Sequence, residues 1–305
     1  MSNLVRGLVT KVVPLVVVFA VVQVLIATYV ISDYQIATMA TICINIVLAV
    51  SLNLITGFTG QFSLGHAGFM AIGAYTAGMV LMQEPSMLGF VVGLLGGAAL
   101  AAVVGVLVGL PTLRLRGDYL AIATLGMAEI IRILLLNLPF TNGAAGLSGI
   151  PQFLDWPTMF VLTVATVWII SNFLRSSAGR ACVSVREDEI AAESIGINTV
   201  RSKVLAFTIG AFFGGLAGGM YASYFYFIKP DLFGFLKSID ILVIVVLGGL
   251  GSLSGSIIAA ILLALISTAL QGFTEIRMIL YALLLVVIMI FRPEGLMGSR
   301  ELSLT

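Results

Sequence analysis

The sequence predicts an all-α membrane protein, a polytopic transmembrane helical bundle of about 8–10 spans with broken or re-entrant helices. Of 305 residues, 60% are hydrophobic and only 10% are charged, whereas soluble domains use about 25% charged residues. The mean hydropathy is +1.16, and the apolar runs are longer than the roughly ten-residue strands of membrane barrels. Because backbone polar groups in lipid must be satisfied internally, runs of this length are expected to be helical.

About ten apolar segments are candidate spans. They cover residues 12–31, 36–56, 62–82, 88–110, 119–138, 158–174, 204–227, 239–247, 256–271 and 278–291. The first is longer than a signal-peptide core and lacks a small-x-small cleavage motif, so we expect it to be a retained span. Segments 239–247 and 278–291 are shorter than the roughly twenty residues of a full span, and are expected to be tilted helices or half-helices within the bundle. An eight-span arrangement with a re-entrant pair stays open.

Lys and Arg in short connections indicate which side of the membrane each connection occupies. Cytoplasmic positions are predicted for Arg6, Lys11, Arg114, Arg116, the loop 175–203 and residues 292–300; Asp33, Glu84, residues 139–157 and the Glu275 loop are predicted outside. Both termini are therefore expected in the cytoplasm. The loop with Lys229 and Lys237 is the exception, since two bases lie outside, offset by Asp231 and Asp240.

Glycine is abundant, at 33 residues, and many glycines stand four apart. The pairs are Gly93/Gly97, Gly105/Gly109, Gly210/Gly214, Gly214/Gly218, Gly215/Gly219 and Gly251/Gly255. A spacing of four places two glycines on one helix face and lets a neighbouring backbone approach closely. The pattern predicts a tightly packed bundle.

The longest predicted cytoplasmic loop contains a helix signal at residues 185–195. Ser184 and Glu187 match a capping box, and Glu187, Asp188 and Glu189 place negative charge on the first turn. Gly196 is suited to end this helix in a left-handed conformation. The small apolar surface of Ala191, Ala192 and Ile195 either docks into a groove of another protein or belongs to a helix that only joins two spans.

A second set of polar residues surrounds the glycine-rich stretch at residues 56–60, which is expected to interrupt a helix. The candidates for a translocation path here are Asn53, Gly57, Gln61, Ser63 and His66, with Asn45 nearby. Interhelical hydrogen bonding is the alternative role for each side chain. His66 is the only His, and no carboxylate stands at ligand spacing, so no metal site is expected.

Glu129 and Arg132 stand three residues apart on one helical face of the segment 119–138. Ions in a span are costly unless they are paired or hydrated. The two residues are expected to form a structural ion pair, and Glu129 is also a candidate for the translocation path.

The sequence gives little support to catalysis or nucleic-acid binding. It has no Ser-His-Asp set, no H-E-x-x-H motif and no pair of carboxylates on one helix face within the membrane, so no catalytic residue is assigned. The net charge is +1, which indicates no nucleic-acid partner. Cys43 and Cys182 fall in different environments, and no disulfide is expected. Without a G-x-x-x-x-G-K-[ST] loop, the chain does not supply its own P-loop for ATP.

Several motifs, in consistent order over nearly the whole chain, resemble the LivM-type branched-chain amino acid permeases of ABC importers. They are NLITGFTGQFSLGHAGFMAIGAYTAG (53–78), GDYLAIATLGMAEIIR (117–132), TNGAAGLSGIP (141–151), LGGLGSLSGSIIAA (247–260) and FRPEGLMG (291–298). The stretch from Asp188 or Glu189 through Ala191 and Ala192 to Gly196 is similar to the EAA loop that docks on the cytoplasmic ATPase in this class. The loop is degenerate here, because it lacks a Glu-Ala-Ala triplet.

The resemblance implies one permease domain over residues 1–305, with an ATPase-coupling loop at 180–203. Candidate coupling residues are Arg186, Glu187, Asp188, Glu189, Ala191, Ala192, Glu193 and Gly196. It further implies a LivH-like partner permease, two ABC ATP-binding subunits that carry the ATP, an extracytoplasmic solute-binding protein, and a place in the lipid of a bacterial inner membrane. An ABC permease for urea or short amides, an ion-coupled secondary transporter and a passive channel are the alternatives.

Overall fold

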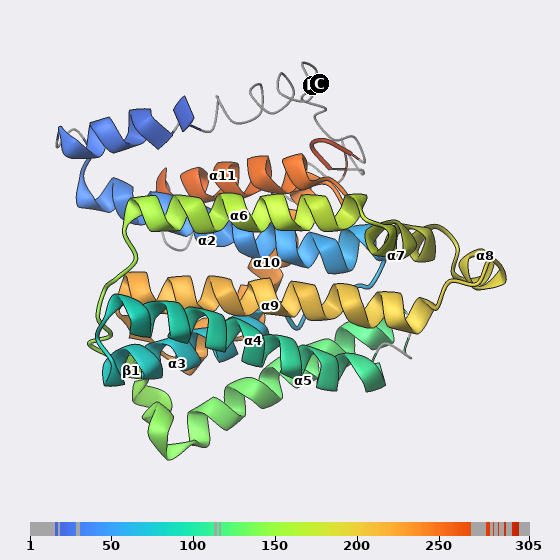
Figure 1. The fold of residues 1–305 in the computed structure, drawn as a ribbon, viewed down its shortest axis with the longest axis horizontal. Coiled ribbons are helices and arrows are strands. Elements are labelled where there is room, and N and C mark those ends of the chain that lie inside the picture. The colour runs from blue at the N-terminus through green and yellow to red at the C-terminus, as the bar shows by residue number, and fades with distance from the viewer. Residues whose placement is uncertain are drawn as a thin grey trace.

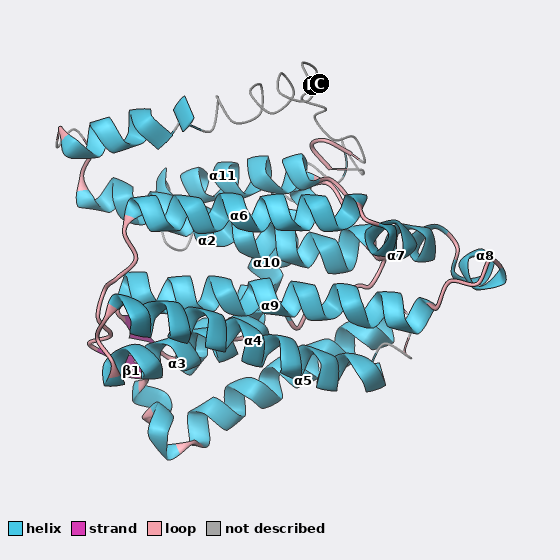
Figure 2. Ribbon diagram, viewed as in Figure 1, coloured by secondary structure: helices cyan, strands magenta, loops and turns pink. Residues whose placement is uncertain are grey.

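The computed structural model describes residues 16–17, 19–28, 31–112, 115, 117–269, 279–280, 283, 286, 290 and 295–298. Figure 2 shows that this part of the chain is almost wholly helical, which confirms the all-α prediction. The two chain ends and most of the predicted segment 278–291 lie outside the described residues. The cytoplasmic position of the termini therefore stays a prediction.

Within the described residues, 5 helices are long and apolar enough to cross a membrane. They are α2, Asp33–Asn53, continued by a π-helical turn η1 at Leu54–Phe58; α4, Met87–Thr112; α5, Asp118–Asn137; α6, Trp156–Arg175; and α9, Thr199–Phe225. Shorter apolar helices are α3, His66–Gln83; α10, Phe235–Gly248; and α11, Leu253–Ala269. In the first predicted span, the described residues 16–17 and 19–27 are also helical.

The helices run side by side and their connections alternate between the two ends of the bundle (Figure 1). At one end lie α7, Ser177–Glu187, and α8, Glu189–Ser194. At the other end β1, Leu147–Ser148, pairs antiparallel with β2, Phe227–Ile228, with Leu147 opposite Ile228. Short 3-10 turns follow α5 at Pro139–Thr141 and Gly143–Ala145, and precede α10 at Pro230–Phe233 (η4).

Local signals place the helix ends. Ser32 and Gln35 form a capping box at the start of α2, which the sequence analysis missed. Pro157 lies in the first turn of α6, where its missing N–H costs nothing. The Asn198 side chain accepts a hydrogen bond from the Arg201 N–H, so α9 begins five residues before the predicted segment 204–227.

Two helices begin inside the bundle instead of at its ends. The first-turn residue Ala67 of α3 donates its N–H to the Ser238 hydroxyl in the first turn of α10, at 3.4 Å. Lys237 Nζ lies 3.5 Å from Asn45 Oδ1, near the midpoint of the span 33–58. The predicted short segment 239–247 is therefore a half-helix of 14 residues. Lys237 and Asp240 belong to this helix and not to an outer loop, whereas Lys229 and Asp231 lie in the connection before it. The predicted exception to the charge rule is therefore corrected for Lys237 alone.

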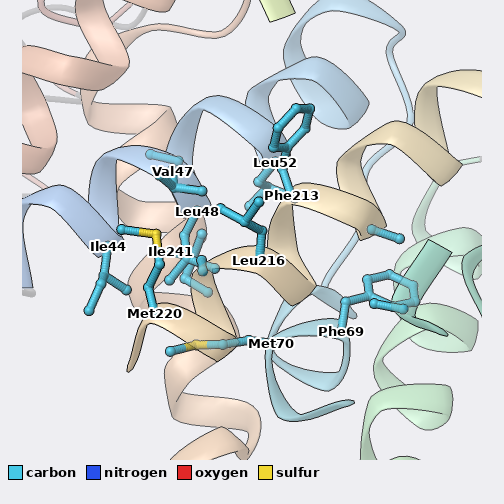
Figure 3. Close-up of a cluster of buried hydrophobic side chains, with 14 of the residues drawn as sticks. Ile44, Val47, Leu48, Leu52, Phe69, Met70, Phe213, Leu216, Met220 and Ile241 are labelled. Atoms are coloured by element: carbon cyan, nitrogen blue, oxygen red, sulfur yellow. The ribbon is translucent and has the colours of Figure 1, made fainter. Parts of the chain in front are cut away.

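The buried core lies where α2, α3, α9 and α10 meet. Figure 3 shows this cluster, with side chains from all four helices directed toward one another. Its labelled members are Ile44, Val47, Leu48, Leu52, Phe69, Met70, Phe213, Leu216, Met220 and Ile241. Interlocking of these side chains holds α3 and α10 against α2 and α9, because dispersion contacts are lost wherever packing leaves a gap.

Helices α3, α4 and α9 approach one another through glycine. A Cβ at Gly73 would fall on the carbonyl oxygen of Gly215, and one at Gly218 would fall on the carbonyl oxygen of Met70. Gly97 faces the same contact, since its Cβ would lie 2.8 Å from the Gly73 oxygen. Gly215 and Gly218 of α9 therefore serve backbone packing, as predicted, whereas Gly214 and Gly219 lie against side chains of His66 and Leu94.

One glycine pair was assigned wrongly. Gly251 and Gly255 do not share a helix face, because Gly251 lies in the turn before α11 begins at Leu253. Gly255 makes its close contact with Gly248 at the end of α10, whereas Gly251 lies against Arg186. Gly251 has φ +86°, a left-handed conformation that does not occur inside a right-handed α-helix.

The close packing predicts different outcomes for two Gly→Ala changes. Gly218→Ala should lower the free energy of unfolding by about 1–3 kcal/mol, because the methyl group has no room against the Met70 carbonyl. Gly96→Ala, on the open face of α4 with nothing within 4 Å of a Cβ, should change it by less than about 1 kcal/mol, or stabilise the helix. Thermal unfolding of the purified chain in detergent measures both. Equal midpoints for the two variants would contradict this packing.

Candidate functional site

The chain is unwound between α2 and α3, as the sequence predicted for residues 56–60. The π-helical turn replaces the regular α-helical bonding at the end of α2. Thr59 Oγ1 donates to the Leu54 carbonyl at 2.9 Å, and the Gln61 N–H donates to the Ile55 carbonyl at 3.1 Å. Residues 59–65 then run without regular structure to the start of α3 at His66.

Asn53 holds this unwound stretch against the turn between α10 and α11. Its side-chain Nδ2 donates to the Ser252 carbonyl at 2.9 Å and the Ser256 hydroxyl at 2.7 Å, and its Oδ1 accepts the Gly251 N–H at 2.9 Å. The residue is fully buried. Gly57 lies against the same atoms, since a Cβ there would be 2.9 Å from Asn53 Cγ. Asn53 thus takes part in interhelical hydrogen bonding, and Gly57 packs closely beside it.

Gln61, Ser63 and His66 are also buried, each at 2% exposure or less. Gln61 Nε2 donates to the Lys203 carbonyl at 3.2 Å, while its Oε1 has no hydrogen-bond partner among the described residues. Ser63 Oγ accepts the Gly65 N–H at 3.4 Å. His66 Nε2 lies 2.8 Å from Ser51 Oγ, and its Nδ1 has no such partner within the described part of the chain.

Glu129 is paired, as expected. Its Oε2 lies 2.8 Å from Arg132 Nε, and Arg132 Nη1 lies 3.3 Å from Asp231 Oδ1. Asp231 belongs to η4, so the three charges tie α5 to the segment that leads into α10. The sequence analysis missed Asp231 as a partner, because it is distant along the chain. These side chains are 27–57% exposed, so the three charges lie at the surface of the bundle and not in its core.

The predicted loop helix 185–195 is wrong as a single element. Residues 177–187 form α7, the chain turns at Asp188, and α8 follows. Ser184 lies inside α7 and donates its hydroxyl to the Ala181 carbonyl, so it caps nothing. Asp188 is the actual cap, because its carboxylate accepts the N–H groups of Ile190 and Ala191 at 2.9 and 3.0 Å. An aspartate that follows a helical stretch is a common N-cap, and Asp188 was the sequence signal for the start of α8.

Gly196 does end α8 in a left-handed conformation, with φ +87°. The Gly196 N–H donates to the Glu193 carbonyl, and the Ile197 N–H donates to the Ala192 carbonyl. These bonds satisfy two of the last carbonyls of the helix, as in the predicted C-terminal cap.

Three polar side chains of the loop bond to the bundle. Glu189 pairs with Lys203 of α9 at 2.6 Å, and Glu193 Oε1 accepts from the Thr199 hydroxyl at 2.8 Å. Arg186 Nη1 donates to the Gly57 carbonyl at 2.8 Å and pairs with Glu187. The loop is thereby joined both to α9 and to the unwound end of α2.

The outward side of α8 and its C-cap Ile195 carry exposed apolar side chains beside the exposed Glu193 and Ser194. Ile190 is 74% exposed and Ile195 is 76% exposed, with Ala191 exposed beside them. Ala192, which the sequence analysis placed on this surface, is 2% exposed and packs inward. Ile190 was missed, although an isoleucine amid charged residues was the signal that could have found it. In Figure 1, α8 projects from the end of the bundle.

Both cysteines are free, and both are buried, although the sequence placed them in different environments. In α7, burial raises the pKa of the Cys182 thiol to about 11, and a side-chain hydrogen bond with Thr59 partly offsets the rise. The thiol is therefore protonated and unreactive at neutral pH. No group of three or more His, Cys, Asp or Glu residues among those the structure describes could hold a metal ion.

Comparisons with known proteins show which family the chain is similar to. A family model described as branched-chain amino acid transport system / permease component matches residues 34–291. The branched-chain amino acid permease protein LivM of Salmonella typhimurium is 40% identical over 305 residues, which cover 87% of this chain and 70% of the relative. LivM of Escherichia coli K12 is 40% identical over 83% of this chain and 68% of its own length.

A more distant relative is the permease protein LivH of Escherichia coli K12, with 24% identity over 84% of this chain and 92% of the relative. No solved structure shows a significant match. The family model spans the described helical bundle from α2 to α11. The chain therefore belongs to the family of branched-chain amino acid transport permeases.

Proposed function

We propose that the chain is the LivM-type permease subunit of an ABC importer for branched-chain amino acids. The observation that carries the proposal is the 40% identity to two LivM proteins along most of the chain. In the proposed complex a LivH-like permease completes the translocation path, two ATP-binding subunits supply the energy, and an extracytoplasmic solute-binding protein delivers the cargo. The complex lies in the bacterial inner membrane.

The ATP-binding subunits dock on the outward face of α8. Support comes from the exposed Ile190, Ala191 and Ile195, which would cost free energy in water but gain it in a protein groove. The inward bonds of Glu189 and Glu193 hold this apolar face away from the bundle. A short helix fixed in this way presents a rigid surface, so little ordering entropy opposes docking.

The unwound stretch 59–65 borders the translocation path. Irregular backbone at membrane depth is tolerated where it is buried in protein or lines a water-filled cavity. Gln61 and His66 each retain one buried polar atom without a hydrogen-bond partner in the described chain. Those atoms favour a place where water or the cargo completes the bonding.

The pairing of Glu129 and the family match both weigh against the ion-coupled alternative. Proton or sodium coupling usually uses an acidic residue in the membrane, and Glu129 was the strong candidate. Its carboxylate is engaged with Arg132. The family match likewise does not favour the urea or amide alternatives.

Reconstitution tests the proposed function. The chain, its partner permease and both ATPases are placed in proteoliposomes, with leucine-loaded binding protein on the extracytoplasmic side and ATP on the other. We expect leucine uptake and a rise in ATP hydrolysis that both require the loaded binding protein. Uptake that follows a sodium or proton gradient without ATP would overturn the proposal, and uptake of urea but not leucine would overturn the cargo.

Docking on α8 predicts the effect of an acidic substitution. Ile190→Glu should weaken association with the ATPases by about 2 kcal/mol, roughly thirtyfold, because a charge replaces an apolar anchor. Phe140→Glu is the matched control, since Phe140 is 59% exposed at the opposite end of the bundle. Co-purification at graded ATPase concentrations measures both. If the two variants bind the ATPases equally, α8 is only a connector.

Cysteine labelling tests the orientation. Ser194 in α8 and Ala144 before β1 are both exposed, whereas Thr141 is fully buried. With Cys43 and Cys182 replaced by alanine, a membrane-impermeant thiol reagent applied to intact cells should label Ala144→Cys but not Ser194→Cys. Permeabilised cells should show both. Strong labelling of Ser194→Cys in intact cells would invert the topology.

A further inference from the structure

Three segments that are distant in the sequence meet at the guanidinium of Arg186. Its Nη1 donates to the carbonyl of Gly57, at 2.8 Å, in the π-helical end of α2. A Cβ at Gly60 would lie 3.0 Å from Arg186 Cγ, and a Cβ at Gly251 would lie 2.6 Å from its Nη1. The last turn of α7, the unwound stretch and the α10–α11 turn therefore share one side chain.

We infer that Arg186 is the positioning residue that transmits movement of the cytoplasmic loop to the unwound end of α2. The inference rests on the proposed function and changes the role of Arg186 within it. The sequence analysis grouped Arg186 with residues that dock on the ATPase, whereas its hydrogen bond to Gly57 directs it into the bundle.

The π-helical turn supplies the contact point. Because the regular pattern of backbone bonds is broken there, the carbonyl of Gly57 receives an external donor. The bond is charge-assisted, hence shorter and stronger than a bond between neutral groups. Gly57 also lies so close to Asn53 and the Gly251 N–H that a side chain would not fit. Displacement of Gly57 therefore displaces the α10–α11 turn that Asn53 holds.

Glu187 fixes the direction of the guanidinium. Its Oε1 lies 3.0 Å from Arg186 Nε and 2.5 Å from Nη2, which leaves Nη1 to reach Gly57. Arginine suits this arrangement, because its planar fork donates in two directions at once while lysine presents a single ammonium.

A second connection runs parallel to the first. Glu189 in the first turn of α8 pairs with Lys203 Nζ, and the carbonyl of Lys203 accepts from Gln61 Nε2 at 3.2 Å. The loop is thus attached to the unwound region at two places, near Gly57 and near Gln61. Two separated attachments convert a shift of the loop into a shift of the segment as a whole, and not into a local bend.

The first experiment compares Arg186→Ala and Arg186→Lys with Arg175→Ala in the complete reconstituted complex. Arg175 lies at the same end of the bundle, in the last turn of α6. We expect Arg186→Ala to lower leucine uptake per ATP hydrolysed at least tenfold while the ATPases remain bound and active. Arg186→Lys should recover part of the ratio, and Arg175→Ala should keep it within twofold of the wild type.

An unchanged ratio in Arg186→Ala, in a complex whose wild type transports leucine, would overturn the inference and leave the proposed function intact. A wild-type complex without ATP-driven uptake would instead overturn the proposed function itself. The two failures are distinguishable because the ratio is always referred to the wild-type complex.

A second experiment tests the same link by disulfide cross-linking between positions 60 and 186. An ideal Cβ at Gly60 lies 3.5 Å from Arg186 Cβ, within the range of disulfides. With Cys43 and Cys182 replaced by alanine, Gly60→Cys/Arg186→Cys should cross-link under mild oxidation in both the nucleotide-free and the ATP-trapped complex, because the two segments move together. Cross-linking in only one state, or in neither, would contradict a persistent link. The Gly60→Cys single variant controls for intermolecular disulfides.

Discussion

The architecture depends on finding hydrogen-bond partners for the backbone N–H and C=O groups that lie inside this membrane protein but outside regular helices. The chain leaves regular α-helical bonding at Leu54 and resumes it only at His66, and lipid offers no hydrogen bonds to the groups set free. The Asn53 amide bonds the α10–α11 turn, and Thr59 bonds the carbonyl of Leu54. Without these partners each buried polar group would cost about 1–3 kcal/mol, so the broken helix exists only because neighbouring segments complete it.

Close glycine packing brings those neighbouring segments within reach. Apolar side chains gain little by leaving lipid for other apolar side chains, so helices in a membrane associate through tight contact of small residues. The near contact of Gly73 with the Gly215 carbonyl, and of Gly218 with the Met70 carbonyl, sets α3 directly on α9. This placement fixes where α3 begins, and hence where the first turns of α3 and α10 meet at Ala67 and Ser238.

The loop formed by α7 and α8 has an inner side that is bonded to the bundle and an outer side that is exposed. Two of its charged side chains bond inward, Arg186 to Gly57 and Glu189 to Lys203. Its apolar side chains at Ile190 and Ile195 point away from the bundle. A structure with a bonded inner face and an apolar outer face has the features required of a coupling element, since one face can bind a partner while the other moves the membrane segment.

The sequence by itself determined the all-α membrane class, the approximate positions of the spans, the break near Gly57, the Glu129–Arg132 pair and the left-handed end of α8 at Gly196. These follow from local chemistry: run length, the conformations open to glycine, and side chains three residues apart on one helix face. Only the tertiary structure decided that Asn53 bonds the α10–α11 turn, that Asp231 joins the Glu129–Arg132 pair, that Ala192 is buried while Ile190 is exposed, and that Arg186 faces Gly57. Each of these depends on contact between segments up to about two hundred positions apart, whose relative placement is set by helix packing and leaves no signal in either local stretch.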